Sequence, residues 1–405
     1  MNKRNVKTYY PIIPLTCALL YITQGMIIPE GSIVSRALLV VYLLFAFSHF
    51  AIVGINYRSK IVSAITLFLF LQFIYFLFGE QYYIRMDGEW MYSLGNMIAI
   101  IFTFSLFYEF YYYSLKGKLS EKQLVIYVIV FIILSIPRYF YTEMKMIEAM
   151  FLKGWNVEDV TNNTAYYFLE AFAFIPLIYK KKKLSLAIIA TSGFFILLSA
   201  KRGAILIFAV CLLFYLPFFL KNNKRISLLL IPVIVVMGII AFNYFSHDAY
   251  LLERLMKTTE GYSSGRDDIY GSIINYCLYD HFSIDTFLFG YGFNYSIKIA
   301  GNVAHNDWLE LLSCSGLLGI TVYLSIYILL MLELKKIRNN AYKRTMTLCL
   351  VVLFLRTFFS ASYTSTVLIF SIIGFILGSE KRNCIYENFS RRRLLPERKG
   401  EQFNK

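Results

Sequence analysis

The chain has 405 residues, of which 58% are hydrophobic and only 16% are charged, and its mean hydropathy is +0.58. This balance excludes an ordinary soluble globular protein, because the apolar residues form many runs, each about long enough to cross the hydrocarbon core of a bilayer as a helix of roughly 20 residues. Backbone groups in lipid must be hydrogen-bonded within their own segment, so these runs are predicted to be helices.

The net charge of +15 does not indicate a nucleic-acid partner. The basic residues gather in short loops between apolar runs, as membrane topology requires, and we predict no nucleic-acid binding. The six cysteines show no C-x-x-C spacing, so no disulfide framework is predicted. No histidines or acidic residues stand at a recognised metal-ligand spacing, so neither a metal nor a cofactor is predicted.

The chain is predicted to be one all-α, polytopic membrane domain over residues 1–405, with about twelve transmembrane helices. The first apolar run follows basic residues without a convincing cleavage site, so it is expected to be a retained span. The predicted spans are 11–28, 33–55, 61–78, 93–115, 123–137, 164–179, 184–200, 203–220, 226–245, 309–333, 346–360 and 363–378.

The basic residues also orient the spans. Most of the 40 Lys and Arg residues fall into loops on one side, and each of those loops carries an excess separately. Because basic loops are cytoplasmic, both termini are predicted to be cytoplasmic, with a basic tail over 379–405. The polar interval 246–304 then faces outward, as an extracytoplasmic catalytic loop containing short helices. A shorter outer loop, 137–163, has the composition of an interfacial helix.

Arg266 lies at a predicted helix start within the long outer loop. Ser264 and Asp267 have capping-box spacing, which predicts a helix from about Gly265 to Asp280. First-turn N–H groups favour anions, and a guanidinium fork in that turn suits phosphate oxygens. The alternative is a surface arginine paired with a neighbouring aspartate.

Lys201 and Arg202 occupy a short turn between two apolar runs, on the predicted outer side. Two adjacent cations there run against the positive-inside trend. An anionic ligand near the outer headgroup layer would explain both. The alternative is that both side chains reach lipid phosphates.

His305 precedes the apolar helix that is predicted to begin at Asn306 or Asp307. An imidazole at this boundary can accept a proton from an incoming hydroxyl, or bind phosphate when charged. The alternative for a single histidine is a structural hydrogen bond.

Ionisable residues within the predicted spans include Arg36, Glu109, Glu170 and Arg356. Charge is costly in hydrocarbon, so such residues are functional candidates by default. Glu170 and Arg356 are candidates for an ion pair across the bundle.

The stretch Gly290-Tyr291-Gly292 is predicted to be a structural turn, because glycines permit a tight turn and close backbone approach. It lacks the GxxxxGK[ST] and strand–GxGxxG–helix contexts of nucleotide-binding loops. Nucleotide binding is therefore not predicted.

The order of these motifs resembles that of the bacterial O-antigen polymerase/O-antigen ligase superfamily. One departure is Cys314-Ser315, near which relatives often carry an acidic residue. The stretches that carry the resemblance are Ser199-Ala200-Lys201-Arg202-Gly203, Gly265-Arg266, Leu288-Phe289-Gly290-Tyr291-Gly292, and His305-Asn306-Asp307-Trp308-Leu309-Glu310-Leu311-Leu312 with Gly316-Leu317-Leu318-Gly319.

The resemblance implies a GT-C-like, metal-independent, inverting glycosyltransferase of the bacterial inner membrane, with undecaprenyl pyrophosphate-linked oligosaccharide as donor. Arg202 and Arg266 would neutralise the pyrophosphate leaving group, and His305 would orient or deprotonate the acceptor hydroxyl. Further substrate-binding residues are predicted to be Lys201, Asn306 and Arg356.

The acceptor decides between two activities that the resemblance allows. We favour a repeat-unit polymerase of O-antigen or capsule polysaccharide; the alternative is a ligase that transfers polymer to lipid A–core in lipopolysaccharide assembly. A lipid-linked oligosaccharide flippase is an alternative of another class, but it predicts pseudo-symmetric halves that are not apparent. A non-catalytic assembly partner is a further alternative. Expected partners besides the donor are membrane lipid and a chain-length regulator protein.

Overall fold

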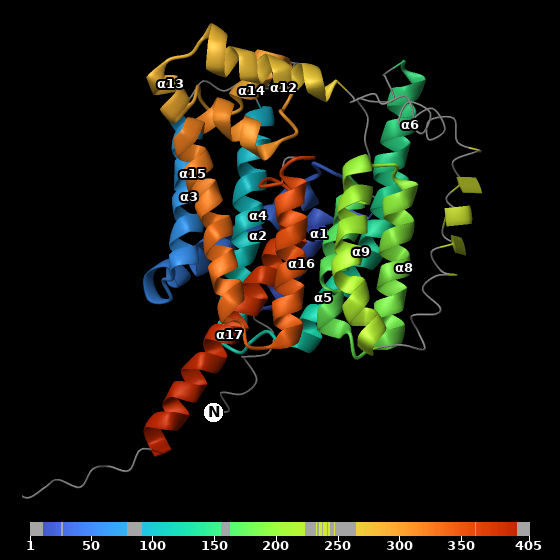
Figure 1. Ribbon diagram of the computed structural model, residues 1–405, viewed down its shortest axis with the longest axis vertical. Coiled ribbons are helices and arrows are strands. Elements are labelled where there is room, and N and C mark those ends of the chain that lie inside the picture. Colours follow the sequence, from blue (N-terminus) through green and yellow to red (C-terminus); the bar gives the residue numbers. More distant parts are fainter. Residues whose placement is uncertain are drawn as a thin grey trace, which may run out of the picture.

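The computed structural model describes residues 11–25, 27–78, 91–154, 163–222, 265–360 and 362–394, with a few residues between 232 and 247. Within these ranges the chain is helical and contains no strand, which confirms the all-α prediction. Figure 1 shows long helices standing side by side, with a layer of short helices across one end. The C-terminal end of the last helix lies at the opposite end.

Most of the predicted apolar spans coincide with helices. The predicted span 226–245 lies mostly outside the described residues. The longer helices are α2 (Ile33–Asn56), α3 (Lys60–Phe78), α4 (Met91–Leu115), α5 (Glu121–Pro137), α8 (Lys182–Leu198), α9 (Arg202–Asn222), α15 (Asp307–Lys336), α16 (Asn340–Arg356) and α17 (Val367–Leu394). The shorter helices are α1 (Ile12–Ile22), α6 (Lys145–Leu152), α7 (Thr164–Ala173), α12 (Arg266–Asn275), α13 (Ile284–Phe289) and α14 (Tyr295–Ala300).

Two predicted boundaries differ from the structure. Helix α17 continues to Leu394, well beyond the predicted end at residue 378, so part of the predicted tail is helical. Helix α5 does not end at Pro137 but continues through a π-helical turn, Arg138–Met144, into α6. A proline near the outer end of a helix disturbs only the preceding turn. Here the helix continues past Pro137 by changing to a π-helical turn.

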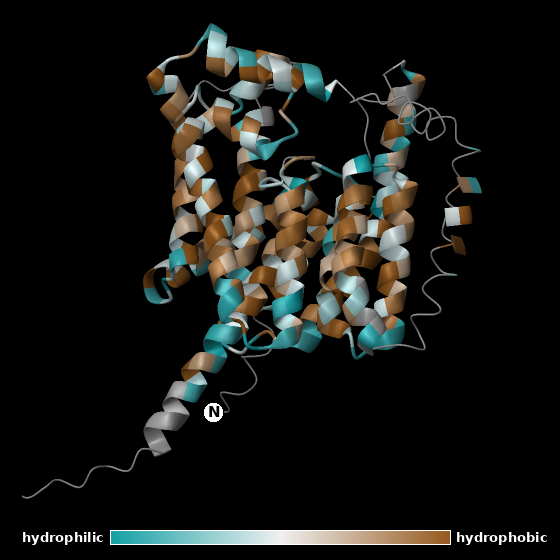
Figure 2. Ribbon diagram, in the orientation of Figure 1, coloured by the Kyte–Doolittle hydropathy of each residue, from teal (hydrophilic) through white to brown (hydrophobic). Residues whose placement is uncertain are grey.

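Five helical stretches of the described chain are long and apolar enough to cross a membrane, and they identify a multi-pass membrane protein. They are Ile33–Asn56, Lys60–Phe78, Ser93–Leu115, Glu121–Met150 and Asp307–Lys336. In Figure 2 the hydrophobic colour follows the long helices, and the hydrophilic colour gathers toward their ends. The total of twelve crossings stays a prediction.

Helices α4 and α17 approach closely because α17 presents glycines to α4. A Cβ added at Gly374 would lie 2.4 Å from the carbonyl oxygen of Phe107, and one at Gly378 would lie 2.4 Å from that of Tyr111. The two glycines are one turn apart, and small residues at this spacing let membrane helices pack backbone against backbone.

The predicted ion pair between Glu170 and Arg356 is confirmed. Both side chains are buried, and the Arg356 guanidinium bonds Glu170 Oε1. Glu170 Oε2 also accepts from the backbone N–H of Leu368, at 2.8 Å, in the first turn of α17. A second Arg356 nitrogen donates to Ser365 Oγ at 2.7 Å. One buried pair therefore joins α7, α16 and α17.

Replacing Arg356 with alanine is expected to destabilise the protein by about 3–5 kcal/mol, because it leaves the Glu170 carboxylate buried without its counter-ion. The measurement is thermal unfolding of the purified protein in detergent. Arg36→Ala is the matched control, since Arg36 is an exposed arginine of α2. The double replacement Glu170→Leu/Arg356→Met should recover much of the loss. Equal melting temperatures for Arg356→Ala and Arg36→Ala would contradict the structural role of the pair.

Candidate active site

The turn between α8 and α9 carries the two predicted cations. Ala200 adopts a left-handed backbone, φ +49°, which is uncommon for a residue with a side chain. Lys201 is buried, donates to Asn163 Oδ1, and places its Nζ 4.8 Å from the centre of the Tyr166 ring. Arg202 is half-buried and is the first residue of α9, where the helix dipole adds positive potential.

Arg266 approaches from the outer loop as the first residue of α12. The helix predicted from about Gly265 to Asp280 is present as α12 and the π turn Tyr276–Asp280. The predicted cap is wrong: Gly265, at φ +67°, is the N-cap residue, and Ser264 lies outside the described residues. Arg266 interacts electrostatically with Tyr166, Tyr270 and His305.

His305 lies where these two segments meet. Burial, and then the charges of Arg266 and Lys201, lower the pKa of His305 to about 4. The imidazole is therefore neutral near pH 7 and has a lone pair for accepting a proton. Its backbone is left-handed, φ +51°, and such strain in a residue with a side chain is often found at functional sites.

The start of α15 is clamped directly behind His305. Asn306 is the N-cap residue, and its side chain accepts from the N–H groups of Trp308 and Leu309 at 2.9 and 3.3 Å. The buried Asp307 carboxylate accepts from Ser362 N–H at 2.8 Å. These contacts fix the direction in which the chain leaves His305.

Glu310 secures the segment that leads into His305. Its buried carboxylate accepts from Ser296 Oγ at 2.7 and 2.8 Å, and from the N–H of Ala304 at 2.8 Å. Ala304 directly precedes His305, and Asp307 follows it two residues later. The histidine is therefore held on both sides by acidic residues of α15, by Glu310 through Ala304 and by Asp307.

Two glycine motifs bring the outer loop against α15. Gly316 interrupts α15 with φ +59° and ψ −157°, and Gly290 has φ +75° and ψ −172°, a region open essentially to glycine alone. The kink frees the carbonyls of Ser313 and Cys314, which accept from the N–H groups of Tyr291 and Gly292 at 2.9 and 3.0 Å. The stretch Gly290-Tyr291-Gly292, predicted to be a structural turn, therefore packs by its backbone against α15.

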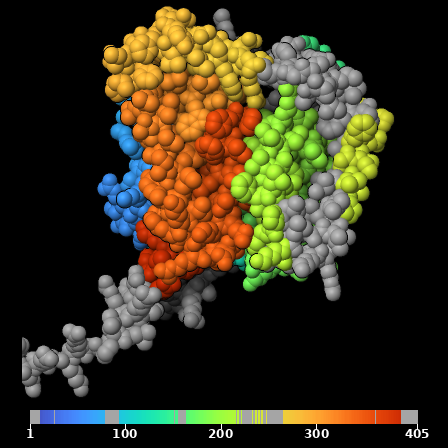
Figure 3. Space-filling model, in the orientation of Figure 1, coloured from blue at the N-terminus to red at the C-terminus, as the bar shows by residue number. Residues whose placement is uncertain are grey.

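The short helices at this end form a continuous layer. In Figure 3 the atoms of α12 and α13, in gold, cover the end of the bundle next to α15. The described part of the outer loop, residues 265–304, therefore packs over the helix ends, and we call it the roof. Contacts at Gly290, Gly316 and Glu310 hold it there.

The structure brings together three of the predicted site residues, Lys201, Arg266 and His305, with Asn306 adjoining them. Arg202 follows Lys201 at the same helix start. Arg356 lies one layer behind: it is buried, and its guanidinium stacks 4.2 Å from the centre of the Tyr166 ring. Its contact with substrate stays a prediction.

Sequence reasoning missed Tyr166, Tyr270 and Asn163. Tyr270 lies close to Arg266 and Asn306, and its hydroxyl is 3.4 Å from the carbonyl oxygen of Phe358. With 33 tyrosines in the chain, an aromatic at a span end carries no distinctive signal. Among the described residues, no three His, Cys, Asp or Glu side chains gather as a group that could hold a metal ion.

Gly316→Ala is expected to loosen the roof and to abolish activity, because the new Cβ would lie 2.6 Å from Gly290 N and the backbone region suits glycine alone. The strain should cost about 1–3 kcal/mol. Limited proteolysis of the loop, combined with thermal unfolding, measures both effects. Gly271→Ala is the control, since a Cβ there meets nothing within 4 Å. Identical cleavage patterns for the two variants would contradict the docking role.

Comparison with protein families identifies a match to part of the chain. The family model described as O-antigen ligase matches residues 186–324, and no curated protein matches the chain. The matched range runs from α8 into α15, so it contains the Lys201 turn, the outer loop with Arg266, and His305. The match therefore supports a relationship of this segment to the O-antigen ligase/polymerase superfamily.

Proposed function

We propose that this protein is a glycosyltransferase that moves a glycan from undecaprenyl pyrophosphate to a sugar hydroxyl at the outer face of the bacterial inner membrane, with both of its termini in the cytoplasm. One observation carries the proposal: Arg266 and Lys201 come from distant parts of the chain, and the charges of both act on His305 and lower its pKa. The family match supports the same class of reaction. Proteins with a GT-C-like architecture perform this type of transfer, and we extend that architecture to this chain.

The cations would act on the leaving group. As the bond from the anomeric carbon to the diphosphate oxygen breaks, its electron pair stays on the diphosphate, where negative charge develops. Fixed cations in a poorly hydrated site stabilise such charge without reorganising at the moment of reaction. Arg266, Lys201 and Arg202 would supply this stabilisation, and the proposal requires no metal.

His305 would act on the acceptor. The attacking hydroxyl oxygen forms the new bond to the anomeric carbon from the side opposite the diphosphate, so the configuration inverts. Its proton passes to the neutral imidazole of His305 and then to water. Asn306, which continues the chain at the helix start, would help to orient the acceptor hydroxyl.

For the acceptor we propose the growing end of another lipid-linked repeat, which makes the protein a polymerase of O-antigen or capsule. The description of the matching family as O-antigen ligase favours lipid A–core as the alternative acceptor. Glycan analysis of a deletion strain separates the two. Single capped repeats indicate a lost polymerase, whereas accumulated long lipid-linked polymer indicates a lost ligase.

Arg266→Ala, Arg202→Ala and His305→Ala are each expected to lower the transfer rate on the order of 10²–10³-fold, as removal of one electrostatic catalytic group does elsewhere. The assay uses reconstituted protein and a defined pyrophosphate-linked repeat, with and without chelator. Lys298→Ala is the control, since Lys298 is an exposed cation of the same roof. Full product from all three variants at normal expression would refute the catalytic proposal.

The acid limb of kcat/KM should lie near pH 4 and not near 6.5, because the folded protein lowers the pKa of His305 to about 4. As the pH falls through about 4, His305 becomes protonated and can no longer accept the proton of the acceptor hydroxyl, so activity falls. Lys201→Gln should move the limb upward, since it removes one of the positive charges that oppose protonation. A limb at the ordinary histidine value in both proteins would contradict the buried, cation-flanked imidazole.

A further inference from the structure

A second cavity lies close to the cation cluster, the name we give to Lys201, Arg202 and Arg266 of the candidate active site. Its volume is about 170 Å³, whereas a single water needs only about 10–15 Å³. It opens among the ends of α1, α4, α7 and the loop before α17. Its lining includes Gln24, Glu30, Gly95, Arg138, Tyr167 and Ser365.

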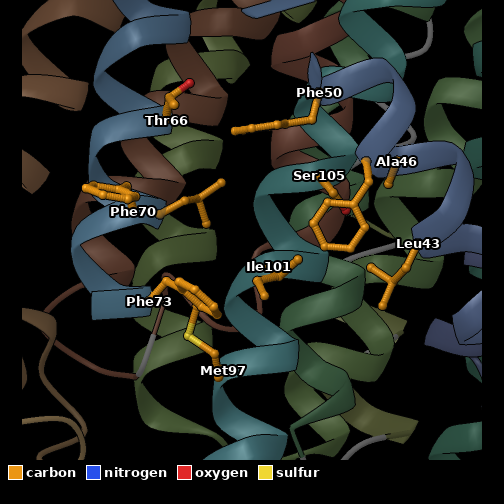
Figure 4. A pocket seen from close by; sticks show the side chains of 11 residues that line it. Leu43, Ala46, Phe50, Thr66, Phe70, Phe73, Met97, Ile101 and Ser105 are labelled. Carbon is orange, nitrogen blue, oxygen red and sulfur yellow. The ribbon is translucent and has the colours of Figure 1, made fainter. Parts of the chain in front are cut away.

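This cavity differs in chemistry from the larger apolar one between α2, α3 and α4. Figure 4 shows that apolar cavity, of about 370 Å³, walled by side chains such as Phe50, Phe70 and Phe73. Thr66 and Ser105 are the polar residues of its lining. Nothing in the structure shows what covers it, whereas the lining of the second cavity has groups that recognise a polar ligand.

Arg138 is the central polar group of the second cavity. Its side chain is largely buried, and its nitrogen Nη2 lies 3.2 Å from Glu143 and 3.6 Å from Glu30. Nη1 donates to the carbonyl of Gln24. Its Nε–H is buried without a hydrogen-bond partner among the described residues, and buried donors are normally satisfied.

The charges in this cavity select against a second diphosphate. Two carboxylates, Glu30 and Glu143, face one guanidinium, so an anion would meet net negative charge. The same groups offer hydrogen-bond donors and acceptors, and Tyr21, Phe102 and Tyr167 add aromatic surface. Alternating donors, acceptors and aromatic faces suit the hydroxyls and C–H face of an uncharged sugar.

The cavity and the cation cluster share a wall. Ser365 lines the cavity and accepts from Arg356 at 2.7 Å. Arg356 stacks 4.2 Å from the centre of the Tyr166 ring, and Lys201 lies 4.8 Å from the same centre. Ser365, Arg356 and Tyr166 thus form a chain of contacts from the wall of the cavity to Lys201.

We propose that this cavity binds a sugar of the acceptor glycan and so anchors the acceptor next to the candidate active site. The inference rests on the proposed transferase function, which it deepens by assigning the acceptor side. The donor diphosphate and the acceptor sugar then bind on opposite sides of the first turn of α7. Separate sites allow both substrates to be held at once in a reactive orientation.

Gly95→Leu tests the assignment by filling the cavity. Gly95 lines it, and a Cβ there meets nothing within 4 Å, so the helix should accept the larger side chain. Gly54→Leu is the matched control: Gly54 lies near the C-terminal end of α2, lines a different cavity, and also has open space at Cβ. Glu30→Gln is a second variant, which removes an exposed carboxylate at the cavity and should not disturb folding.

The probe is the repeat-unit oligosaccharide of the host strain, freed of lipid and phosphate, titrated into the full-length protein by saturation-transfer NMR. We expect Gly95→Leu and Glu30→Gln to weaken its binding about tenfold or more, and Gly54→Leu to change it less than about twofold. Inorganic pyrophosphate should bind all four proteins alike. Unchanged oligosaccharide binding in both cavity variants would overturn the assignment, and Glu30→Gln decides alone if Gly95→Leu does not fold.

The same proteins separate failure of this assignment from failure of the transferase proposal. If the wild-type protein transfers glycan but the cavity variants keep the wild-type acceptor KM, the acceptor site is elsewhere and the function stands. If oligosaccharide binding depends on the cavity but no transfer occurs under any condition, the cavity is a sugar site and the transferase proposal fails.

Discussion

A buried carboxylate at Asp307 is the constraint on which the geometry of the site depends. Asp307 is fully buried, and it accepts from the N–H of Ser362 and from the hydroxyl of Tyr323, each at 2.8 Å. Its own N–H donates to the carbonyl of Thr357 at 2.8 Å. A buried charge without partners is costly, so the start of α15 depends on the loop between α16 and α17, which supplies the partners Ser362 and Thr357. His305, two residues earlier, is placed by that requirement.

Two other acidic residues extend the same logic around the cations. Glu310 holds the end of the outer loop through Ser296 and Ala304, and Glu170 holds the start of α17 together with Arg356. In a chain with only 16% charged residues, three buried carboxylates thus surround one functional region. A buried polar group is costly when it lacks hydrogen-bond partners, but a network whose members are all hydrogen-bonded makes the surrounding structure rigid. A rigid frame of this kind suits a site that must hold charge without rearranging.

The sequence could indicate candidate site residues where a charged or titratable side chain stands next to an apolar segment. Cations at an outer turn, as at Lys201, and a histidine before an apolar helix, as at His305, stand out against hydrocarbon and could be predicted. What could not be predicted depends on tertiary contact: the stacking of Arg356 on Tyr166, the glycine cap of α12, and the backbone docking of Gly290 on Gly316. A glycine pair reads as an ordinary turn until its partner backbone is known. The span 226–245 lies mostly outside the described residues.

Arg266, Lys201 and His305 are expected to surround one lipid-borne diphosphate. The most direct measurement is a cryo-EM structure of the full-length protein in lipid nanodiscs with a non-transferable, undecaprenyl pyrophosphate-linked repeat bound. We expect the phosphate oxygens to lie within hydrogen-bond distance of Arg266 and Lys201, with the anomeric carbon facing His305. Diphosphate density in another part of the molecule, away from these three side chains, would contradict this mechanism.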